Sequence, residues 1–289
     1  MQFSMDLSQP ALPPMGAALP ASLAFRKNLV CYTSDASTVV EYLQNLKLPY
    51  CIWDDYECVE AKERPDTGTV LVLPNVDKSL VRHQDQLAKY LQVMRQRETP
   101  FFAAIATVSP EFVPYAHMTA YLKRQFWFAC HEPRPQDLVE LSELELPSLR
   151  STLRQIHVHQ SIRRYVLDIV VHLRVHRFSK QASGGGCSAH ALGDMLELCQ
   201  TLALAQERTF VVPDLVKLAA QWYFPFHIEV IQDPRHEISL QFGSDPDLVA
   251  QVLEKLRNFS LHRSRETQYP LYFQFMVLRD VLRIVVPPI

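Results

Sequence analysis

The sequence predicts an α/β protein in which a parallel sheet flanked by helices is followed by a helical lid and a helical C-terminal extension. Five short apolar runs in the first half alternate with segments of helical periodicity, which is typical of crossover units in a mainly parallel sheet. The second half carries apolar residues at helical spacing. With 48% apolar residues among 289, the chain has enough of them to bury a sizeable core.

The expected strands are the apolar runs at residues 29–33, 50–53, 69–73, 101–107 and 125–130. The third and fourth runs are apolar almost throughout, which is typical of strands covered on both faces. Ser34 and Asp35 follow the first run and belong to the residue types that cap helices, so a helix is expected next. Another helix is expected before the fourth run, where Leu87, Leu91 and Met94 share one face.

The second half is expected to be mostly helical. An apolar stripe at residues 162–173 has helical spacing, and further helices are expected to begin at Pro213 and Pro246, because proline suits the first turn of a helix. A last helix is expected near the C-terminus. Two short strands are expected at residues 227–230 and 237–242.

We divide the chain into a flexible tail (1–24), an α/β domain (25–135), a helical lid domain (136–232) and a C-terminal extension (233–289). The tail is expected because its residues include four prolines and neither Lys nor Arg, and so do not form a basic signal peptide. The boundary near residue 135 follows two prolines, after which the composition becomes acidic.

The composition excludes several classes of protein. A formal charge of −2 argues against a protein whose whole exterior binds nucleic acid or a membrane surface. No apolar run approaches the roughly 18 residues that a membrane-spanning helix needs. The six cysteines contain no C-x-x-C pair, which indicates reduced thiols in an intracellular protein. We therefore expect a protein of the cytoplasm or the nucleus with no membrane partner.

Glycine is scarce in this chain. Only seven glycines are present, and four of them, Gly184, Gly185, Gly186 and Gly193, lie in one short stretch. Loops that cradle phosphate groups use glycine so that backbone N–H groups can approach the anion, and no G-x-x-x-x-G-K-[ST] motif occurs. No phosphate-binding loop is therefore expected, and the glycine cluster is expected to form a turn in the lid.

Three segments resemble the MoxR/magnesium-chelatase branch of the AAA+ ATPases. The run at residues 70–73, followed by a long helix, occupies the place of a Walker B strand. Residues 105–110 resemble the sensor-1 strand, and residues 122–128 resemble the segment that carries the arginine finger. Residues 165–220 resemble the lid. This resemblance implies a fold built around nucleotide binding.

The residues that perform the chemistry in that family are altered here. Pro74 and Asn75 stand where the Walker B carboxylates would hold magnesium and polarise water. Ser109 stands at the sensor-1 asparagine, Gln125 at the arginine finger and His190 at the sensor-2 arginine. The resemblance therefore implies a degenerate member that does not hydrolyse ATP, with no catalytic residue, no cofactor and no bound metal.

A second resemblance covers the helical half and the C-terminus. The strings at residues 163–174, 222–225, 243–249 and 285–288 are similar to a fungal family named for the maintenance of telomere capping. This resemblance implies a link to telomere capping, and it implies no particular biochemical activity.

Two groups of residues are candidates for contacts with partners. The basic group belongs to a segment, residues 150–180, that carries seven Lys and Arg; its candidates are Arg163, Arg164, Arg174 and Arg177. These arginines would bind phosphate groups of a nucleic acid or pair with acidic residues of the same chain. The aromatic group is Trp222, Tyr223 and Phe224, which would be either core residues or an exposed anchor for a protein partner.

Asp168, His172 and His176 are spaced four residues apart, so they share one helix face. That spacing suits zinc ligands, but neighbouring arginines oppose a cation, and a hydrogen-bonded polar face is the favoured interpretation. No metal site is therefore expected.

The sequence predicts a non-catalytic AAA+-like protein, a pseudo-ATPase that serves as an interaction or scaffold module for protein partners in telomere capping or genome maintenance. Two alternatives remain open. One is a nucleotide-binding partner subunit of an active AAA+ ring, to which Arg124 would contribute in trans. The other is a nucleic-acid-binding factor that uses the basic lid helix.

Overall fold

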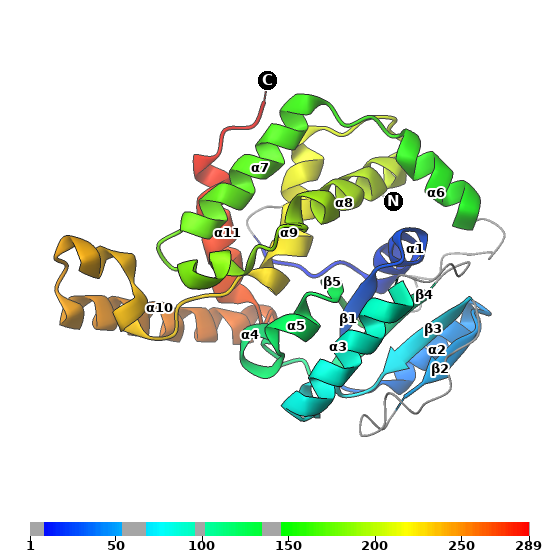
Figure 1. Cartoon of the computed structure of the whole chain (residues 1–289), viewed down its shortest axis with the longest axis horizontal. Helices are drawn as coiled ribbons and strands as arrows, with labels where there is room; N and C mark the ends of the chain where they lie inside the picture. The colour runs from blue at the N-terminus through cyan, green and yellow to red at the C-terminus, as the bar shows by residue number, and fades with distance from the viewer. Residues whose placement is uncertain (1–8, 54–67, 96–101, 135–145, 289) are drawn as a thin grey trace. The chain divides into compact units, whose positions relative to one another are not determined.

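The computed structural model describes residues 9–53, 68–95, 102–134 and 146–288 (Figure 1). The chain divides into two compact units, which we call the sheet unit (Leu12–Gln155) and the helical unit (Ile156–Ile289 together with Met1–Ala11). No helix within the described ranges is both long and apolar enough to cross a lipid bilayer.

The described residues of the sheet unit include five parallel strands in the order β2-β3-β4-β1-β5. These strands are β1 (Asn28–Tyr32), β2 (Tyr50–Ile52), β3 (Thr69–Leu73), β4 (Phe102–Val108) and β5 (Phe126–His131). Every residue of β1, β3 and β4 is buried, as central strands with both faces covered should be. The parallel sheet flanked by helices is confirmed, and each strand lies within two residues of its expected bounds.

The sheet unit also contains helices, most of which lie beside the sheet in Figure 1. They are α1 (Met15–Phe25), α2 (Ser37–Asn45), α3 (Val81–Arg95), α4 (Pro114–His117), α5 (Ala120–Lys123) and α6 (Leu146–Gln155), with a 3-10 turn, η1, at Val76–Lys78. The long α3 precedes β4 and buries Leu87, Leu91 and Met94, as the apolar spacing predicts.

The expected flexible tail is wrong for residues 15–24, because they form most of α1. Met15, Leu19 and Leu23 recur at four-residue spacing and are fully buried, and α1 packs on β1, β4, β5 and α6. Two of the prolines that suggested a tail, Pro13 and Pro14, precede the helix, where a proline does not interrupt its hydrogen bonds. Apolar burial outweighs the single interior proline, Pro20.

The described residues of the helical unit form five helices and three 3-10 segments. The helices are α7 (Gln160–Val175), α8 (Ala191–Ala205), α9 (Pro213–His227), α10 (Pro246–Thr267) and α11 (Tyr272–Ile284), and the 3-10 segments are η4 (Gln181–Gly186), η5 (Pro234–His236) and η6 (Ile238–Phe242). The buried helix α9 packs against α7, α8 and α11. The lid and the C-terminal extension therefore belong to one unit.

The two short strands expected in this half are wrong. His227 ends α9, and Val230 forms only an isolated bridge with Ser179. Residues 238–242 form η6, because the Glu237 side chain accepts a hydrogen bond from the Ser239 backbone N–H and so initiates a helical turn. The alternation of apolar residues there suggested a strand, and local capping decides against it.

The boundary between the units lies after Gln155 rather than near residue 135. Helix α6 belongs to the sheet unit, where Arg150 Nε donates a hydrogen bond to the Ala24 carbonyl at 2.7 Å. Burial and the neighbouring charges of Arg26 and Arg154 lower the pKa of Arg150.

The glycine cluster forms the turn that follows α7. Gly184, Gly185 and Gly186 all have positive φ, between 62° and 83°, a backbone region that other residues rarely adopt. A Cβ atom on Gly186 would lie 1.9 Å from the His227 carbonyl oxygen. Glycine is therefore required at this turn by both its dihedral angles and its close backbone contact.

Candidate functional site

The carboxyl edge of the sheet is the place where parallel α/β proteins bind ligands. The residues that follow β1, β3, β4 and β5 all lie at this edge, because the strands are parallel. These residues are Thr33–Ala36, Pro74–Asn75, Ser109 and Glu132. They include three of the positions where the AAA+ resemblance places altered residues: Pro74, Asn75 and Ser109.

The turn between β1 and α2 is closed by a carboxylate. Asp35 Oδ1 accepts a hydrogen bond from the Ser37 backbone N–H at 2.9 Å, and its Oδ2 accepts one from the Ser37 hydroxyl at 2.6 Å. Ser37 is the first residue of α2, so the carboxylate occupies the helix N-terminus, which favours an anion. The Ser37 hydroxyl and then its backbone N–H hold the pKa of Asp35 below its usual value.

Thr33 joins the ends of three strands. Its backbone N–H donates to the Val108 carbonyl at 3.0 Å, beyond the paired residues of β1 and β4. Its hydroxyl lies 2.9 Å from the Asp35 carbonyl oxygen and 3.1 Å from Glu132 Oε2, and it accepts from the Asp35 backbone N–H at 3.1 Å. This buried hydroxyl is thus occupied by groups of the same chain.

The two residues directly after β3, Pro74 and Asn75, carry no carboxylate; the next carboxylate is that of Asp77 in η1, whose buried Oδ1 has no hydrogen-bond partner among the described residues. Asn75 adopts a left-handed conformation with φ of 52°, and its backbone N–H donates to Thr107 Oγ1 at 3.1 Å. Its side-chain oxygen accepts from Lys78 Nζ at 3.0 Å. After β4, the Ser109 carbonyl accepts from the Phe112 backbone N–H at 3.0 Å. Asn75 and the Ser109 carbonyl thus form hydrogen bonds with groups of the same chain.

Gln125 does not lie at this edge. It precedes β5, and its carbonyl accepts a hydrogen bond from Asn28 Nδ2 at 2.9 Å, while the Asn28 side-chain oxygen accepts from the Ala104 N–H at 2.9 Å. This network ties β5, β1 and β4 together at the amino edge of the sheet. The adjacent Arg124 is exposed and caps α5.

His190 belongs to the helical unit, where it is exposed and precedes α8. Its backbone N–H donates to Ser188 Oγ at 3.2 Å, and its carbonyl accepts from the Asp194 N–H at 3.0 Å. Its described contacts are therefore those of a helix start.

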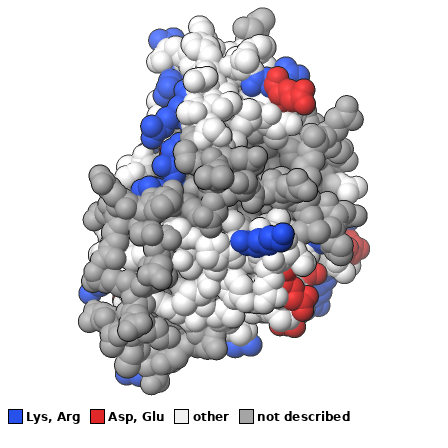
Figure 2. Space-filling view, turned by 90° about the vertical axis from the view of Figure 1, so that its right-hand side faces the viewer, with Lys and Arg blue, Asp and Glu red and all other residues white. Residues whose placement is uncertain are grey.

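The Lys and Arg residues of the basic segment lie in both units and make different kinds of contact. Arg150 and Arg154 lie on α6, whereas Arg163 and Arg164 are exposed on α7. The Arg174 guanidinium donates to the carbonyls of Cys187 and Ser188 at 3.1 to 3.2 Å, so it holds the turn before α8. Figure 2 shows Lys and Arg along one margin of the face that it draws and also at other places on that face, some of them beside Asp and Glu.

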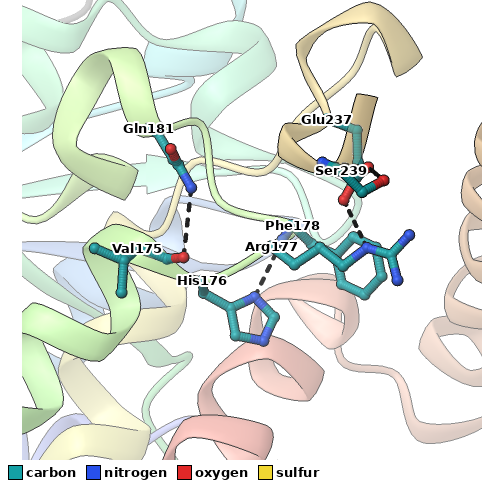
Figure 3. Close-up of polar contacts among 7 residues, drawn as sticks. All are labelled: Val175, His176, Arg177, Phe178, Gln181, Glu237 and Ser239. Atoms are coloured by element: carbon teal, nitrogen blue, oxygen red, sulfur yellow. Dashed lines mark hydrogen bonds and ion pairs between the residues drawn. The ribbon is translucent and has the colours of Figure 1, made fainter. Parts of the chain in front are cut away.

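Arg177 forms an ion pair with a buried carboxylate (Figure 3). Its Nε lies 2.6 Å from Glu237 Oε1; the Glu237 side chain is fully buried, and that of Arg177 is 49% exposed. Burial alone would raise the pKa of Glu237, but hydrogen bonds from Ser239 and Arg177 outweigh it and hold the pKa below its usual value. The ion pair fastens the extension to the end of α7.

The aromatic candidates are core residues. Trp222, Tyr223 and Phe224 lie on α9 and are at most 6% exposed, so their side chains do not form a surface anchor. The Tyr223 hydroxyl lies 3.2 Å from Asp194 Oδ2, and burial, followed by that carboxylate, raises its pKa. The interpretation of these three residues as core is the correct one.

The metal candidates do not form a ligand cluster. His176 lies beyond the end of α7, where its Nδ1 accepts from the Phe178 N–H at 3.2 Å, and His172 Nδ1 lies 2.8 Å from the Asp168 carbonyl oxygen (Figure 3 draws His176). Burial lowers the pKa of His176, and Asp280 opposes that shift. Within the described ranges, no group of three His, Cys, Asp or Glu could hold a metal ion.

Comparison with known proteins places this architecture in a family. No protein-family model matches the chain. A maintenance of telomere capping protein 2 from Lachancea thermotolerans is 66% identical over 99% of this chain and all of that protein. The chain belongs to the maintenance of telomere capping protein 2 family. A second member, from Eremothecium gossypii, is 33% identical over 98% of this chain and all of that protein.

The fold of this telomere-capping family member has a counterpart among solved structures. The crystal structure of a "putative ATPase" from Cytophaga hutchinsonii matches 83% of this chain and 88% of that chain with a TM-score of 0.56 and 12% identity. At that identity the similarity concerns the fold alone. The fold class expected from the sequence, an AAA+-like sheet with a helical lid and extension, is therefore confirmed.

Two features of the site were not recognised in the sequence. Asp35 was expected as a capping residue, but its position at the ligand-binding edge depends on the strand order. The partner of Arg177 is separated from it by 60 residues. Spacing along the chain carries no signal for such a pair.

Proposed function

We propose that this chain is a non-catalytic AAA+-like protein that serves as an interaction or scaffold module in the maintenance of telomere capping. The observation that supports it is the Asp35 carboxylate on the N-terminus of α2. Phosphate-binding loops of P-loop proteins place free backbone N–H groups at the end of this turn. Here the first backbone N–H of α2 already donates a hydrogen bond to the Asp35 carboxylate, and the negative charge of that carboxylate would repel a phosphate group.

The remaining edge supports the same proposal. Hydrolysis needs carboxylates that hold magnesium and orient water, and the residues after β3 are Pro74 and Asn75. The turn between β1 and α2 spans only residues 33–36, which is too short for an eight-residue phosphate loop. A chain with this edge is better suited to holding partners than to turning over nucleotide.

The telomeric part of the proposal comes from the relatives. Members from Lachancea thermotolerans and Eremothecium gossypii carry telomere capping maintenance in their names and match this chain over nearly its whole length. We extend that process to this chain, with a place of action in the nucleus and with protein partners.

A complementation experiment tests the proposal. In a fungal host that lacks its own copy, Asp35→Asn and Asn75→Gly should restore capping as fully as the wild-type chain, measured as the fraction of single-stranded telomeric DNA. Asparagine caps a helix about as well as aspartate, and glycine suits the positive φ of residue 75, so both variants should keep the fold.

Purified wild-type chain should in parallel release no phosphate from magnesium ATP above the level of a heat-denatured sample. Phosphate release that Thr33→Ala abolishes would contradict the non-catalytic assignment. If the wild-type chain failed to restore capping in that host, the proposed role in telomere capping would be contradicted.

A further inference from the structure

Helix α10 is packed on one side only. Of its 22 residues, Val249, Leu253 and Ser260 are buried. Val249 and Leu253 share a small core with Ile231, and Arg257 donates to the backbone carbonyls of Ile231 and Gln232. In Figure 1 α10 lies at the margin of its unit, beside the bundle of α7, α8, α9 and α11. One face of α10 is thus anchored. On the outer face, the Phe259 ring contacts the Tyr272 ring of α11 edge to face, and half of the Phe259 side chain remains exposed for a further contact.

The outer face carries a coiled-coil repeat. Residues at alternating spacings of three and four are Asp245, Leu248, Val252, Lys255, Phe259 and His262, and all six are exposed. The three apolar members are large and unusually accessible: Leu248 is 60%, Val252 41% and Phe259 50% exposed. Alternating three-four spacing is the pattern by which one helix packs along another. We call these six residues the α10 stripe.

The α10 stripe is complementary to itself in the antiparallel direction. When two copies are paired about the middle of the stripe, Leu248 of one faces Phe259 of the other, and Val252 faces Lys255. The outer layers then pair Asp245 with His262. A parallel pair would instead place Asp245 against Asp245 and Lys255 against Lys255, and both contacts are repulsive. The order of residues therefore favours only the antiparallel arrangement.

Further charges agree with this direction. Asp245 and Asp247 stand at the N-terminal end of α10. Arg263, Arg265 and Glu266 stand at its C-terminal end, where Glu266 pairs with Arg263 and the two arginines leave the end with a net positive charge. An antiparallel pair brings each acidic end beside a basic end, and it also opposes the two helix dipoles. Lys255 can lay its aliphatic stem along Val252 while its ammonium group reaches water.

We propose that the α10 stripe binds the α10 stripe of a second copy of this chain, as a two-fold symmetric antiparallel coiled coil. This inference goes beyond the proposed function, since it names a partner surface that does not depend on nucleotide or telomeres. A two-fold contact uses the same patch on both copies and closes on itself, so the assembly stops at a dimer.

Sedimentation equilibrium of the full chain tests the dimer. The wild-type mass should rise with concentration from 33.3 kDa towards twice that value, with a dissociation constant on the order of micromolar, as expected for a small interface. Leu248→Glu should weaken association at least about tenfold, because it places a charge against Phe259 of the second copy. A mass of 33.3 kDa throughout the micromolar range would overturn the proposal.

Leu261→Glu is the matched control. Leu261 is 53% exposed on the same helix but lies on the face opposite the stripe, so its substitution should leave association unchanged. Circular dichroism melting of both variants checks that neither has lost its fold. Equal effects of the two substitutions on association, or no effect of Leu248→Glu on a dimer, would assign the dimer to another surface and overturn the proposal.

Disulfide crosslinking tests the direction. The double variant Leu248→Cys with Phe259→Cys should form covalent dimers under mild oxidation, whereas Leu248→Cys alone and the wild-type chain should not. Covalent dimers from Leu248→Cys alone would indicate a parallel pair and overturn the antiparallel arrangement.

Discussion

The carboxyl edge of the sheet unit and the outer face of α10 differ in how far their side chains are engaged by other groups of the same chain. At the sheet edge, Asp35 holds the start of α2, Thr33 joins three strands, and Asn75 bonds to Thr107. On α10, Leu248, Val252 and Phe259 remain exposed. The first region is the ligand-binding edge of an AAA+-like fold, and the second belongs to the extension.

The difference indicates where binding capacity lies in this chain. A buried polar group without a partner is costly, so a sheet edge that lacks a ligand must satisfy its donors and acceptors from within. Exposed apolar residues at regular spacing carry the opposite signal, because burying them against a partner releases free energy. Capacity for binding is therefore greater on the extension than at the edge where nucleotide binds in ATPases.

The largest expected effect concerns the glycine turn that packs against the end of α9. Gly186→Ala would place a Cβ atom against the His227 carbonyl at a residue with φ of 83°, and we expect it to lower the free energy of unfolding by about 3 kcal/mol or more. Urea denaturation measures the change.

Gly193→Ala is the matched control for this substitution. Gly193 lies within α8 with open space around its Cα, so alanine should raise the free energy of unfolding by about 0.5 to 1 kcal/mol. If both glycine variants had the same stability, the close contact at Gly186 would not constrain the helical unit.

The next effect concerns the ion pair that fastens the extension to α7. We expect Glu237→Ala to lower the free energy of unfolding by about 2 kcal/mol, because it removes a buried carboxylate that accepts from Arg177 and Ser239. Arg283→Ala breaks only an exposed pair with Asp280 and should cost less than about 0.5 kcal/mol. Equal costs in thermal denaturation would show that the ion pair does not hold the extension.

A smaller effect is expected at the sheet edge. Asp35→Ala removes the acceptor at the start of α2 and should lower the free energy of unfolding, whereas Asp35→Asn should retain most of that stability. Chemical denaturation of the two variants measures the difference. Should Asp35→Ala be as stable as the wild-type chain, the carboxylate would have no role in closing the edge.

The smallest expected effect is on the stability of the fold at acid pH. The pKa of Glu237 lies below its usual value of 4.5, so its stabilising contribution is fully present above about pH 4.5 and is lost as the pH falls through the lower, folded-state value. Glu237→Gln should therefore show a flatter decline of melting temperature below pH 4.5 than the wild-type chain. Parallel declines would indicate that Glu237 titrates as an unpaired carboxyl.

The sheet could be predicted well, because its strands are short apolar runs that are buried on both faces. The helix over residues 15–24 could not be predicted from the sequence. The prolines at 13 and 14 indicate a tail, whereas the burial of Met15 and Leu19 depends on the sheet beneath them. Residues 238–242 form a 3-10 turn rather than the predicted strand, because the side chain of Glu237 caps the turn although the alternation of apolar residues there resembles that of a strand.

The candidate site was predictable only in part. The altered positions Pro74, Asn75 and Ser109 could be located along the chain, and they do lie at one sheet edge. The sequence shows the arginines of the basic segment but not their hydrogen-bond partners, because the partners of Arg174 and Arg177 are set by tertiary contacts. The burial of Trp222 likewise depends on how helices pack around α9.

Titration of the full chain with magnesium ATP by calorimetry tests the central claim that the sheet edge no longer binds nucleotide. We expect no saturable heat and no rise in melting temperature. A nucleotide at about a hundred times its dissociation constant would stabilise the fold by about 2.7 kcal/mol, which is easily measured. A saturable heat of binding that Thr33→Ala abolishes would contradict the account.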